Sequence, residues 1–336
     1  MAFDRESEVG AALLTVLLLV AILAVIAAIA LERLTLASRM TRNIVSSDQG
    51  RAYLLAAEQI AGRRIEDMLA QRADRTTLAG DWLGTPQVMT VPGGAVTAVV
   101  RDSGNCFNLN SLVEPVPLEP GVTGPNPLGS RPLGISQFSG LMRLLGVDRA
   151  TADQVAVSAA DWIDSDSKPA PGGAEDEFYA GLKPSYRPAN NLMADPSELR
   201  MVNAVTPQLY ERIRPWICTL PTTDLSPINV NTLLPEQGAL IAMFAPDKLG
   251  VEQTRQLLAQ RPADGYGSLP DFWEQGQLSQ LGLPELVTQQ VKQKSRWFEV
   301  LFSIDLGGDK VEETVLYDAG THPARVVRRQ WSGNGE

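Results

Sequence analysis

An uninterrupted apolar segment near the N-terminus constrains the fold more than any other feature of these 336 residues. It reads GAALLTVLLLVAILAVIAAIALERL and begins at Gly10. From Ala11 to Leu31 it holds no charge, proline or glycine, and Thr15 is its only polar side chain. About twenty apolar residues are enough for a helix to span a bilayer, whereas a cleavable secretory signal has a shorter apolar core. This segment therefore predicts a transmembrane helix.

The helical pattern continues beyond the apolar segment. The next residues read ERLTLASRMTRNIVSSDQGRAYLLAAEQIAGRRIEDMLAQRA, with apolar side chains recurring at helical spacing among Arg and Glu. We therefore predict one helix from Ala11 to about Ala73, on the order of 90 Å long at 1.5 Å per residue. Gly50 and Gly62 weaken this helix locally without breaking it. Its first half suits lipid, and one face of its second half suits packing against a folded domain.

The remaining composition is typical of a folded, soluble body and excludes several classes of function. Charged residues make up 20% of the chain and hydrophobic residues 44%. A formal net charge of −10 opposes general nucleic-acid binding, because such binding depends on neutralising phosphates with Lys and Arg. The chain has one histidine, His322, which leaves little basis for a zinc site or a histidine-based catalytic triad.

Two cysteines, Cys106 and Cys218, leave two interpretations open. If the body of the protein is exported, they can pair and close a loop of roughly 110 residues, which the entropy model values at about 4–5 kcal/mol. In the alternative they are two buried thiols.

The distribution of β-rich segments predicts a sheet that is interrupted by a helical block. Two β-rich runs flank Pro92-Gly93-Gly94 in QVMTVPGGAVTAVVRD and predict a hairpin. The C-terminal segments RWFEVLFSIDLGGDKVEETVLYDA and ARVVRRQWS predict further strands. Between these regions, from about Leu112 to Lys294, short helical patterns alternate with Pro and Gly. We therefore predict an α+β fold with a large, mainly helical insertion.

The helical block contains a weak internal repeat. The segment NLNSL, which begins at Asn108, recurs as NVNTL from Asn229, and each copy precedes an apolar helical pattern. Asp195 and Thr206 are candidate N-caps of two further short helices. Such compact helix pairs resemble SAM-like and helix-hairpin-helix modules. Modules of this kind can bind DNA, but here Glu residues stand beside the Arg residues and leave no basic face.

The densest polar segment reads DWIDSDSKPAPGGAEDEFY. Asp164, Asp166 and Glu175 stand at the first, third and twelfth positions of an EF-hand count, and oxygen ligands at such positions suit Ca²⁺. Lys168 and Pro169 depart from that motif, so this is not a standard EF-hand. Two other interpretations stay open: acidic residues at helix ends and on a solvated surface, or a hydrolytic pair of carboxylates.

The N-terminal organisation resembles that of type IV pilin-like proteins, in which a short polar leader ends in glycine and a membrane helix follows. The resemblance implies that prepilin peptidase cuts after Gly10, so that the mature chain begins at Ala11. Val9 stands where such leaders usually carry a basic residue. Thr15 stands where most pilins carry a glutamate that neutralises the amine of a neighbouring subunit, and a tip subunit has no such neighbour above it. Alternatively, the Thr15 hydroxyl simply bonds back to its own helix.

Four segments in chain order are similar to the K pseudopilins of type II secretion systems: DWIDSD, PGGAEDEFY, YRPANNLMADPSELRMV and INVNTL. Together with the helix predicted from Ala11 to about Ala73, which we call the stem, these segments extend the similarity along most of the chain. It implies a pilin-like core with a helical insertion, located at the tip of the periplasmic pseudopilus with minor pseudopilins I and J. It also implies calcium in the insertion, with five candidate ligands: Asp161, Asp164, Asp166, Glu175 and Asp176.

These observations divide the chain into six segments. In order, we expect a leader at 1–10, a transmembrane helix at 11–31, the first part of a pilin-like core at 32–111, a helical insertion with an acidic loop at 112–227, a second helical, SAM-like part at 228–294, and C-terminal core strands at 295–336.

The expected function is that of a minor pseudopilin without enzymatic activity, anchored once in the bacterial inner membrane with its C-terminal domain in the periplasm. Its expected partners are pseudopilins I and J, other pseudopilins, prepilin peptidase and the inner-membrane secretion platform, and not nucleic acid. Small residues in the membrane segment permit close approach of partner helices: Ala21, Ala24, Ala27 and Ala28. Two alternatives are a DNA-uptake pseudopilin and a membrane-anchored hydrolase that uses the acidic cluster.

Overall fold

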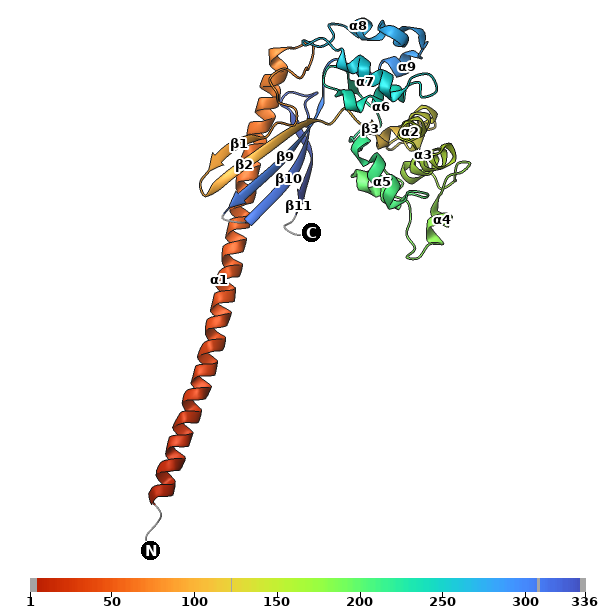
Figure 1. Cartoon of the computed structure of the whole chain (residues 1–336). Helices are drawn as coiled ribbons and strands as arrows, with labels where there is room; N and C mark the ends of the chain where they lie inside the picture. The colour runs from red at the N-terminus through yellow and green to blue at the C-terminus, as the bar shows by residue number, and fades with distance from the viewer. Residues whose placement is uncertain (1–4, 122, 307–308, 333–336) are drawn as a thin grey trace.

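One long helix, α1 (Arg5–Gln71), carries a head at its C-terminal end (Figure 1). The computed structural model describes residues 5–121, 123–306 and 309–332, so residues 1–4 of the expected leader lie outside it. With 67 residues, α1 is on the order of 100 Å long. Among the described helices it is the one long and apolar enough to cross a membrane, and no other described part of the chain buries its apolar part. The continuous helix predicted from the sequence is present.

The head contains a five-stranded antiparallel sheet in the order β1-β2-β9-β10-β11. The first two strands form the predicted hairpin, in which Val91 pairs with Gly94 and Gly93 adopts the positive φ that its turn requires. Strand β2 pairs directly with β9, so the segments before and after the insertion form one sheet. The strands are β1 (Gln87–Val91), β2 (Gly94–Asp102), β9 (Trp297–Leu306), β10 (Asp309–Asp318) and β11 (Arg325–Ser332).

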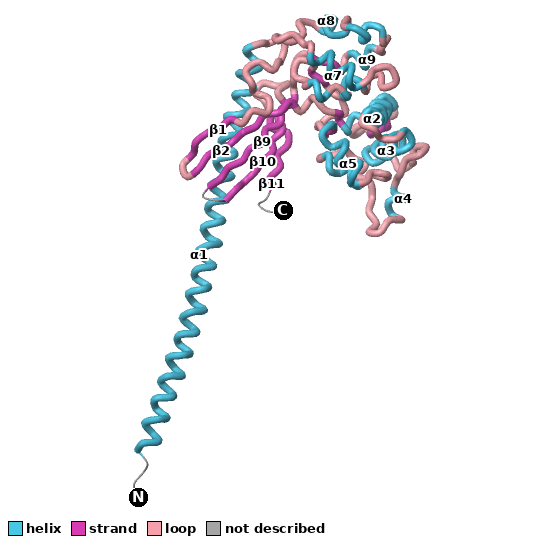
Figure 2. The backbone as a smooth tube through the Cα atoms, viewed as in Figure 1, coloured by secondary structure: helices cyan, strands magenta, loops and turns pink. Residues whose placement is uncertain are grey.

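The second half of α1 packs on one face of this sheet, as Figures 1 and 2 show. Apolar side chains three to four residues apart on the helix meet alternate side chains of the strands. The buried set is Leu54, Ala57, Ile65 and Leu69 from α1, with Val96, Phe298, Val300, Phe302, Ile304, Val315 and Tyr317 from the sheet. A Cβ at Gly62 would lie 3.4 Å from the Tyr317 ring, so this glycine lets the helix approach the sheet closely.

A buried ionic cluster joins the same two elements. Arg329 donates two hydrogen bonds to the Glu58 carboxylate, at 2.7 and 2.6 Å, and pairs with Glu313 at 3.0 Å. The Tyr317 hydroxyl donates to the main-chain oxygen of Glu58 at 2.9 Å. Both carboxylates are buried, so one guanidinium compensates two negative charges.

The insertion forms a helical unit of short segments to one side of the sheet (Figure 2). Asp195 and Thr206 are N-caps, as predicted. The Asp195 side chain caps η2 (Pro196–Met201) by accepting a hydrogen bond from Ser197 N at 2.8 Å. The Thr206 side chain caps α5 (Pro207–Ile213) by accepting a hydrogen bond from Leu209 N at 3.1 Å. The helices are α2 (Pro132–Leu144), α3 (Arg149–Ile163), α4 (Asp176–Ala180), α5 (Pro207–Ile213), α6 (Ala239–Ala242), α7 (Val251–Ala259), α8 (Leu269–Trp273) and α9 (Glu285–Thr288). The 3-10 turns are η1 (Leu109–Leu112), η2 (Pro196–Met201), η3 (Arg214–Trp216), η4 (Pro235–Gln237) and η5 (Gly276–Gln280).

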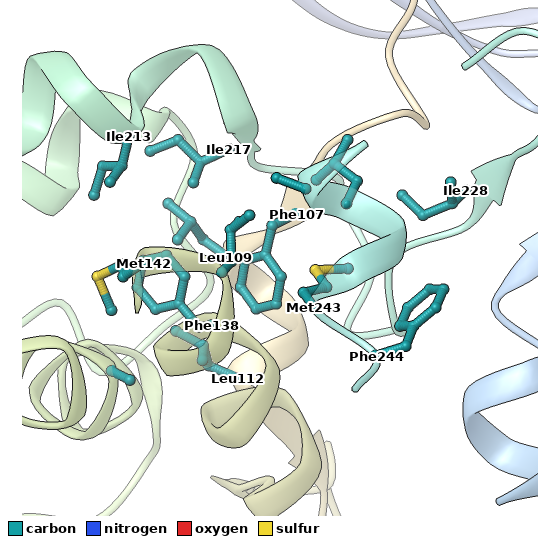
Figure 3. Close-up of a cluster of buried hydrophobic side chains, with 14 of the residues drawn as sticks. Phe107, Leu109, Leu112, Phe138, Met142, Ile213, Ile217, Ile228, Met243 and Phe244 are labelled. Carbon is teal, nitrogen blue, oxygen red and sulfur yellow. The ribbon is translucent and has the colours of Figure 1, made fainter. Parts of the chain in front are cut away.

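A single apolar cluster unites both expected parts of the insertion (Figure 3). Phe107 stacks on Phe138 with ring centroids 4.9 Å apart, and Leu109 is fully buried beside them. The predicted boundary of the core at residue 111 is therefore wrong. Its first sheet part ends at Asp102, and the segment from Phe107 onward packs in the helical unit because its side chains and its main chain find their partners there.

The weak sequence repeat corresponds to a repeated local structure. Asn110 accepts from Met193 N at 2.8 Å and donates to Met193 O at 3.0 Å. Asn231 does the same with Tyr266, at 2.6 and 3.3 Å. Each copy also begins with a short strand in a parallel pair. The short strands are β3 (Phe107–Asn108) with β6 (Ile217–Cys218), and β7 (Ile228–Asn229) with β8 (Val291–Lys292); β4 (Val113–Pro115) and β5 (Leu128–Ser130) pair antiparallel.

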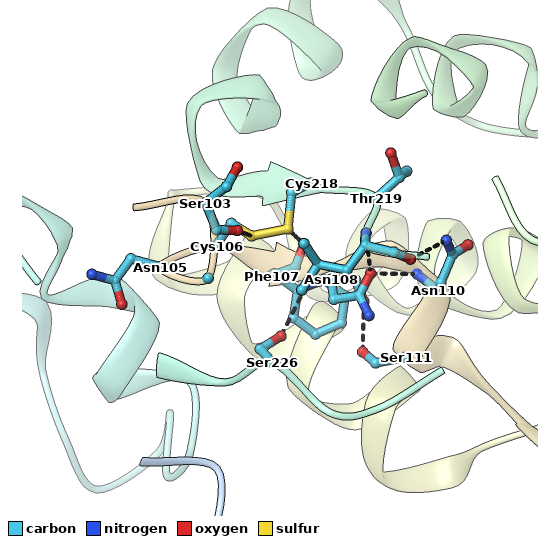
Figure 4. The surroundings of a disulfide bond; sticks show 12 residues. Ser103, Asn105, Cys106, Phe107, Asn108, Asn110, Ser111, Cys218, Thr219 and Ser226 are labelled. Carbon is cyan, nitrogen blue, oxygen red and sulfur yellow. Dashed lines mark hydrogen bonds between the residues drawn. A yellow bond between two sulfur atoms is a disulfide. The ribbon is translucent and has the colours of Figure 1, made fainter. Parts of the chain in front are cut away.

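A disulfide between Cys106 and Cys218 lies where the helical unit meets the sheet (Figure 4). The two Cα atoms are 5.8 Å apart, across 112 residues of sequence. The sulfurs pack in a buried cluster with Trp297 and Leu316 of the sheet. Of the two interpretations of these cysteines, the structure contains the bonded one.

Candidate functional site

The acidic loop connects α3 to α4 and is framed by the ends of both helices. Asp164 is the C-cap of α3, with an extended main chain that ends the helix, and Glu175 is the N-cap of α4. Pro169 and Pro171 lie between them and prevent the helix from continuing. This local arrangement turns the chain back, so that residues eleven positions apart face each other.

Three of the five predicted ligands come together. Asp164, Asp166 and Glu175 each offer an oxygen, and these oxygens lie within 4.8 Å of one another. Asp164 is 4% exposed and Glu175 is 2% exposed, whereas Asp166 is open to solvent. Oδ1 of Asp164 and both oxygens of Glu175 have no hydrogen-bond partner among the described residues. Buried carboxylate oxygens without donors are suited to a hard cation such as Ca²⁺.

The electrostatics of the loop favour a positive charge at the same place. Burial raises the pKa of Glu175 to about 8, with added repulsion from Asp164 and Asp161. Burial likewise raises the pKa of Asp164 to about 6, with repulsion from Asp166 as a further cause. The pKa of Asp161 also rises to about 6 because of burial, followed by repulsion from Asp164. A cation bound among these carboxylates would lower all three pKa values.

The other two predicted ligands, Asp161 and Asp176, lie outside this group of three. Asp161 accepts from Ala170 N at 3.2 Å and so holds the loop against α3. A Cβ at Gly173 would lie 1.9 Å from Asp161 Oδ2, so glycine is needed for this close approach. Asp176 occupies the first turn of α4, where a negative charge is favourable. For Asp161 and Asp176 the structure thus supports roles in the loop and the helix end.

Sequence reasoning missed two polar residues beside the carboxylates. The Ser130 hydroxyl donates to Asp164 Oδ2 at 2.8 Å from strand β5, and no sequence signal connects the two. Asn190 donates to the main-chain oxygen of Asp166 at 3.3 Å, and its own Oδ1 is buried without a partner among the described residues. Asn190 has a φ of +45°, a conformation that asparagine tolerates, so the Asn-Asn pair in YRPANNL was the available signal.

The predicted processing site and the tip marker both lie in α1. Gly10 lies within the helix, five residues after its first residue, and Ala11 follows it. The Thr15 hydroxyl donates to Ala12 O at 2.8 Å, which is the back-bonded arrangement named as its alternative role.

A long helix that packs its second half along an antiparallel sheet, with an exposed apolar N-terminal half and a helical unit inserted in the head, defines a pilin-like subunit with a candidate membrane anchor. Two family models, both described as "Type II secretion system (T2SS), protein K", match residues 105–222 and 228–292. Protein K of Pectobacterium carotovorum subsp. carotovorum is 32% identical, over 98% of both chains. Protein K of Aeromonas hydrophila is 32% identical, over 97% of this chain and 98% of the relative. The chain belongs to the type II secretion system protein K family.

A solved structure agrees with this assignment. The K subunit in the crystal structure of the GspK-GspI-GspJ complex from enterotoxigenic Escherichia coli superposes with a TM-score of 0.74 at 27% identity. The match covers 88% of this chain and 99% of the other. The protein is therefore a minor pseudopilin of a type II secretion system, a structural component of that machinery. This assignment favours the pseudopilin interpretation over the DNA-uptake and hydrolase alternatives.

Proposed function

We propose that this minor pseudopilin occupies the tip of the pseudopilus and starts or caps its assembly. The observation that carries the proposal is the helical unit, which projects to one side of the stem and sheet (Figure 1). A head of that width leaves little room for another subunit stacked above it. Thr15, which has no carboxylate to neutralise a neighbour's amine, is consistent with a subunit that has no neighbour above it.

The proposed partners are minor pseudopilins I and J. Support comes from the related K subunit, which was crystallised in a complex with GspI and GspJ. The stem offers a surface for such partners, because its apolar residues are exposed and its alanines permit close helix packing. Other pseudopilins, prepilin peptidase and the secretion platform are further proposed partners of the same stem.

We also propose that residues 11–31 lie in the inner membrane and that the head lies in the periplasm. The exposed apolar half of α1 supports the anchor, and the disulfide is suited to an oxidising compartment. Prepilin peptidase would cut after Gly10 and leave Ala11 as the first residue. Mass measurement of the extracted protein with and without the peptidase tests this step directly.

The acidic loop is proposed as a structural calcium site. Asp164, Asp166 and Glu175 would hold the ion, which would neutralise their charge and tie the end of α3 to the start of α4. The two repeats, centred on Asn110 and Asn231, support a further proposal that the two parts of the helical unit contain SAM-like modules that serve protein contacts.

Immunogold labelling of the head on isolated pseudopili tests the tip position. We expect label at one end of each pseudopilus and none along the shaft. A pseudopilin known to form the shaft, labelled in the same way, is the control. Label distributed along the shaft would contradict the proposal.

A further inference from the structure

A groove of about 490 Å³ lies where the helical unit meets the end of the sheet, apart from the acidic loop. Its walls come from the start of α2, from the loop between β6 and β7, and from the chain that joins α9 to β9. These segments are distant in sequence, so the groove exists only in the folded head.

The charge of this groove is opposite to that of the whole chain. Four cations line it: Arg131, Lys292, Lys294 and Arg296. Its acids are Glu114 and Asp224, so four positive charges face two negative ones in a chain with a net charge of −10. Such a local excess attracts negatively charged ligands.

Three of the cations stand at every second residue from the last residue of β8 to the residue before β9. Lys292, Lys294 and Arg296 are exposed, whereas the intervening Gln293 is half-buried and Ser295 is buried. Arg296 is held by Asp318 through two hydrogen bonds of 2.7 Å, and Lys294 donates to Ala73 O at 3.2 Å. No ion pair engages Lys292 within the described parts of the chain. The two lysines therefore retain charge for a ligand.

A buried amide lines the same groove without a partner. Gln290 is 3% exposed, and neither its Oε1 nor its Nε2 has a hydrogen-bond partner in the part of the chain that the structure describes. Leaving both ends of a buried amide unpaired is unfavourable. A side-chain amide offers a donor and an acceptor together, which is the pair that a main-chain peptide group of another polypeptide can satisfy.

We propose that this groove binds an extended acidic segment of another polypeptide, with carboxylates against Lys292 and Lys294 and a peptide group against Gln290. A lipid headgroup is opposed by position, because Lys294 contacts the end of the stem, on the order of 60 Å along α1 from Leu31. Nucleic acid is opposed by the overall negative charge. The proposal is independent of the tip position.

Fluorescence anisotropy tests the proposal. The probe is a labelled peptide that carries Glu at every second residue, and its binding is measured to the full-length chain in non-ionic detergent. We expect binding that weakens as salt is added, and at least tenfold weaker binding of a peptide with Gln in place of each Glu. Lys292→Glu combined with Lys294→Glu should weaken binding at least tenfold. Lys183→Glu combined with Lys248→Glu, which makes the same charge change at exposed lysines elsewhere, should leave it unchanged.

Gln290→Met separates a ligand contact from a structural role. Removal of an unpartnered amide should leave the Tm unchanged or higher, while the acidic peptide binds at least threefold more weakly. Unchanged peptide affinity in either the Gln290 variant or the double Lys292 and Lys294 variant would overturn the proposal. So would inorganic phosphate that displaces the labelled peptide as effectively as unlabelled peptide does, since the groove would then be a small-anion site.

Discussion

Glu175 illustrates how much a single side chain constrains the acidic loop. Its carboxylate is buried, lacks donors among the described residues, and faces Asp164 and Asp161. Such a group is either protonated or paired with a cation in the folded protein. The proposed calcium ion supplies that cation, which makes stability, calcium and pH linked quantities.

Asp164→Ala should abolish the response of the protein to calcium. At a hundredfold excess over Kd, bound calcium stabilises the wild type by about 2.7 kcal/mol, which corresponds to a rise in Tm of about 4–5 °C for a chain of this length. We expect about 1 °C or less in the variant, measured by scanning calorimetry with calcium and after chelation. Asp247→Ala, at an exposed aspartate outside the loop, should keep the wild-type response. Equal responses of wild type and Asp164→Ala would contradict the site.

The raised pKa of Glu175, about 8, predicts an opposite pH dependence of stability and calcium affinity. The ordinary pKa of Glu is 4.5, so the folded ion-free state binds more protons between about pH 4.5 and pH 8. The Tm of the ion-free protein should therefore fall as pH rises through this range, while calcium affinity rises because the ion displaces a proton. Titration calorimetry in buffers of different ionisation enthalpy measures the released proton. Binding without proton release at pH 7 would contradict this prediction.

The sequence was sufficient to predict three of the carboxylates that come together in the acidic loop. Asp164, Asp166 and Glu175 could be predicted because their spacing is local and suits oxygen ligation. The sequence could not separate Asp161 from them, because its bond to Ala170 depends on the folded loop. Ser130 could not be predicted, since it reaches Asp164 from a strand 34 residues away.

At the scale of elements, periodicity predicted the stem and turn chemistry predicted the first hairpin. Both depend on neighbours in sequence. The boundary at 111 was wrong because Asn108 and Asn110 satisfy main-chain groups of residues 83–116 positions away, and no local pattern reports such pairing. The contact between stem and sheet was likewise specified in part by the long-range cluster around Arg329.

Arg329→Met should loosen the stem from the sheet. The change leaves Glu58 and Glu313 buried without their shared cation, which costs about 3–5 kcal/mol. The pKa of Glu313 is raised by burial and by Glu58, so protonation at low pH should recover part of that loss. Urea unfolding of the full-length chain in detergent measures the free energy of unfolding.

Arg255→Met is the matched control for this change. Arg255 pairs with Glu252 on an exposed face of α7, where such pairs contribute about 0–1 kcal/mol. If the two variants lost the same stability, the buried cluster would not be what holds the stem.

At the scale of the whole molecule, the disulfide couples the helical unit to the sheet. It closes 112 residues and packs against Trp297 and Leu316. Replacing Cys106 and Cys218 together by Ala should lower the free energy of unfolding by about 4–5 kcal/mol in the entropy model. Denaturation with and without reductant measures the loss. Reductant should weaken the wild type to the same extent and leave the double variant unchanged; an unaltered wild-type midpoint would contradict the prediction.

The pairing of β2 with β9 has a consequence for how such a head could arise and be re-engineered. Asp102, the last residue before the insertion, is the register partner of Phe298, the second residue of the strand that follows it. Both ends of the helical unit therefore meet at the same end of two neighbouring inner strands, so the unit could be exchanged without altering the rest of the sheet. A short turn grafted between these two strands would yield a plain pilin sheet, and a foreign domain grafted there could be displayed on the stem.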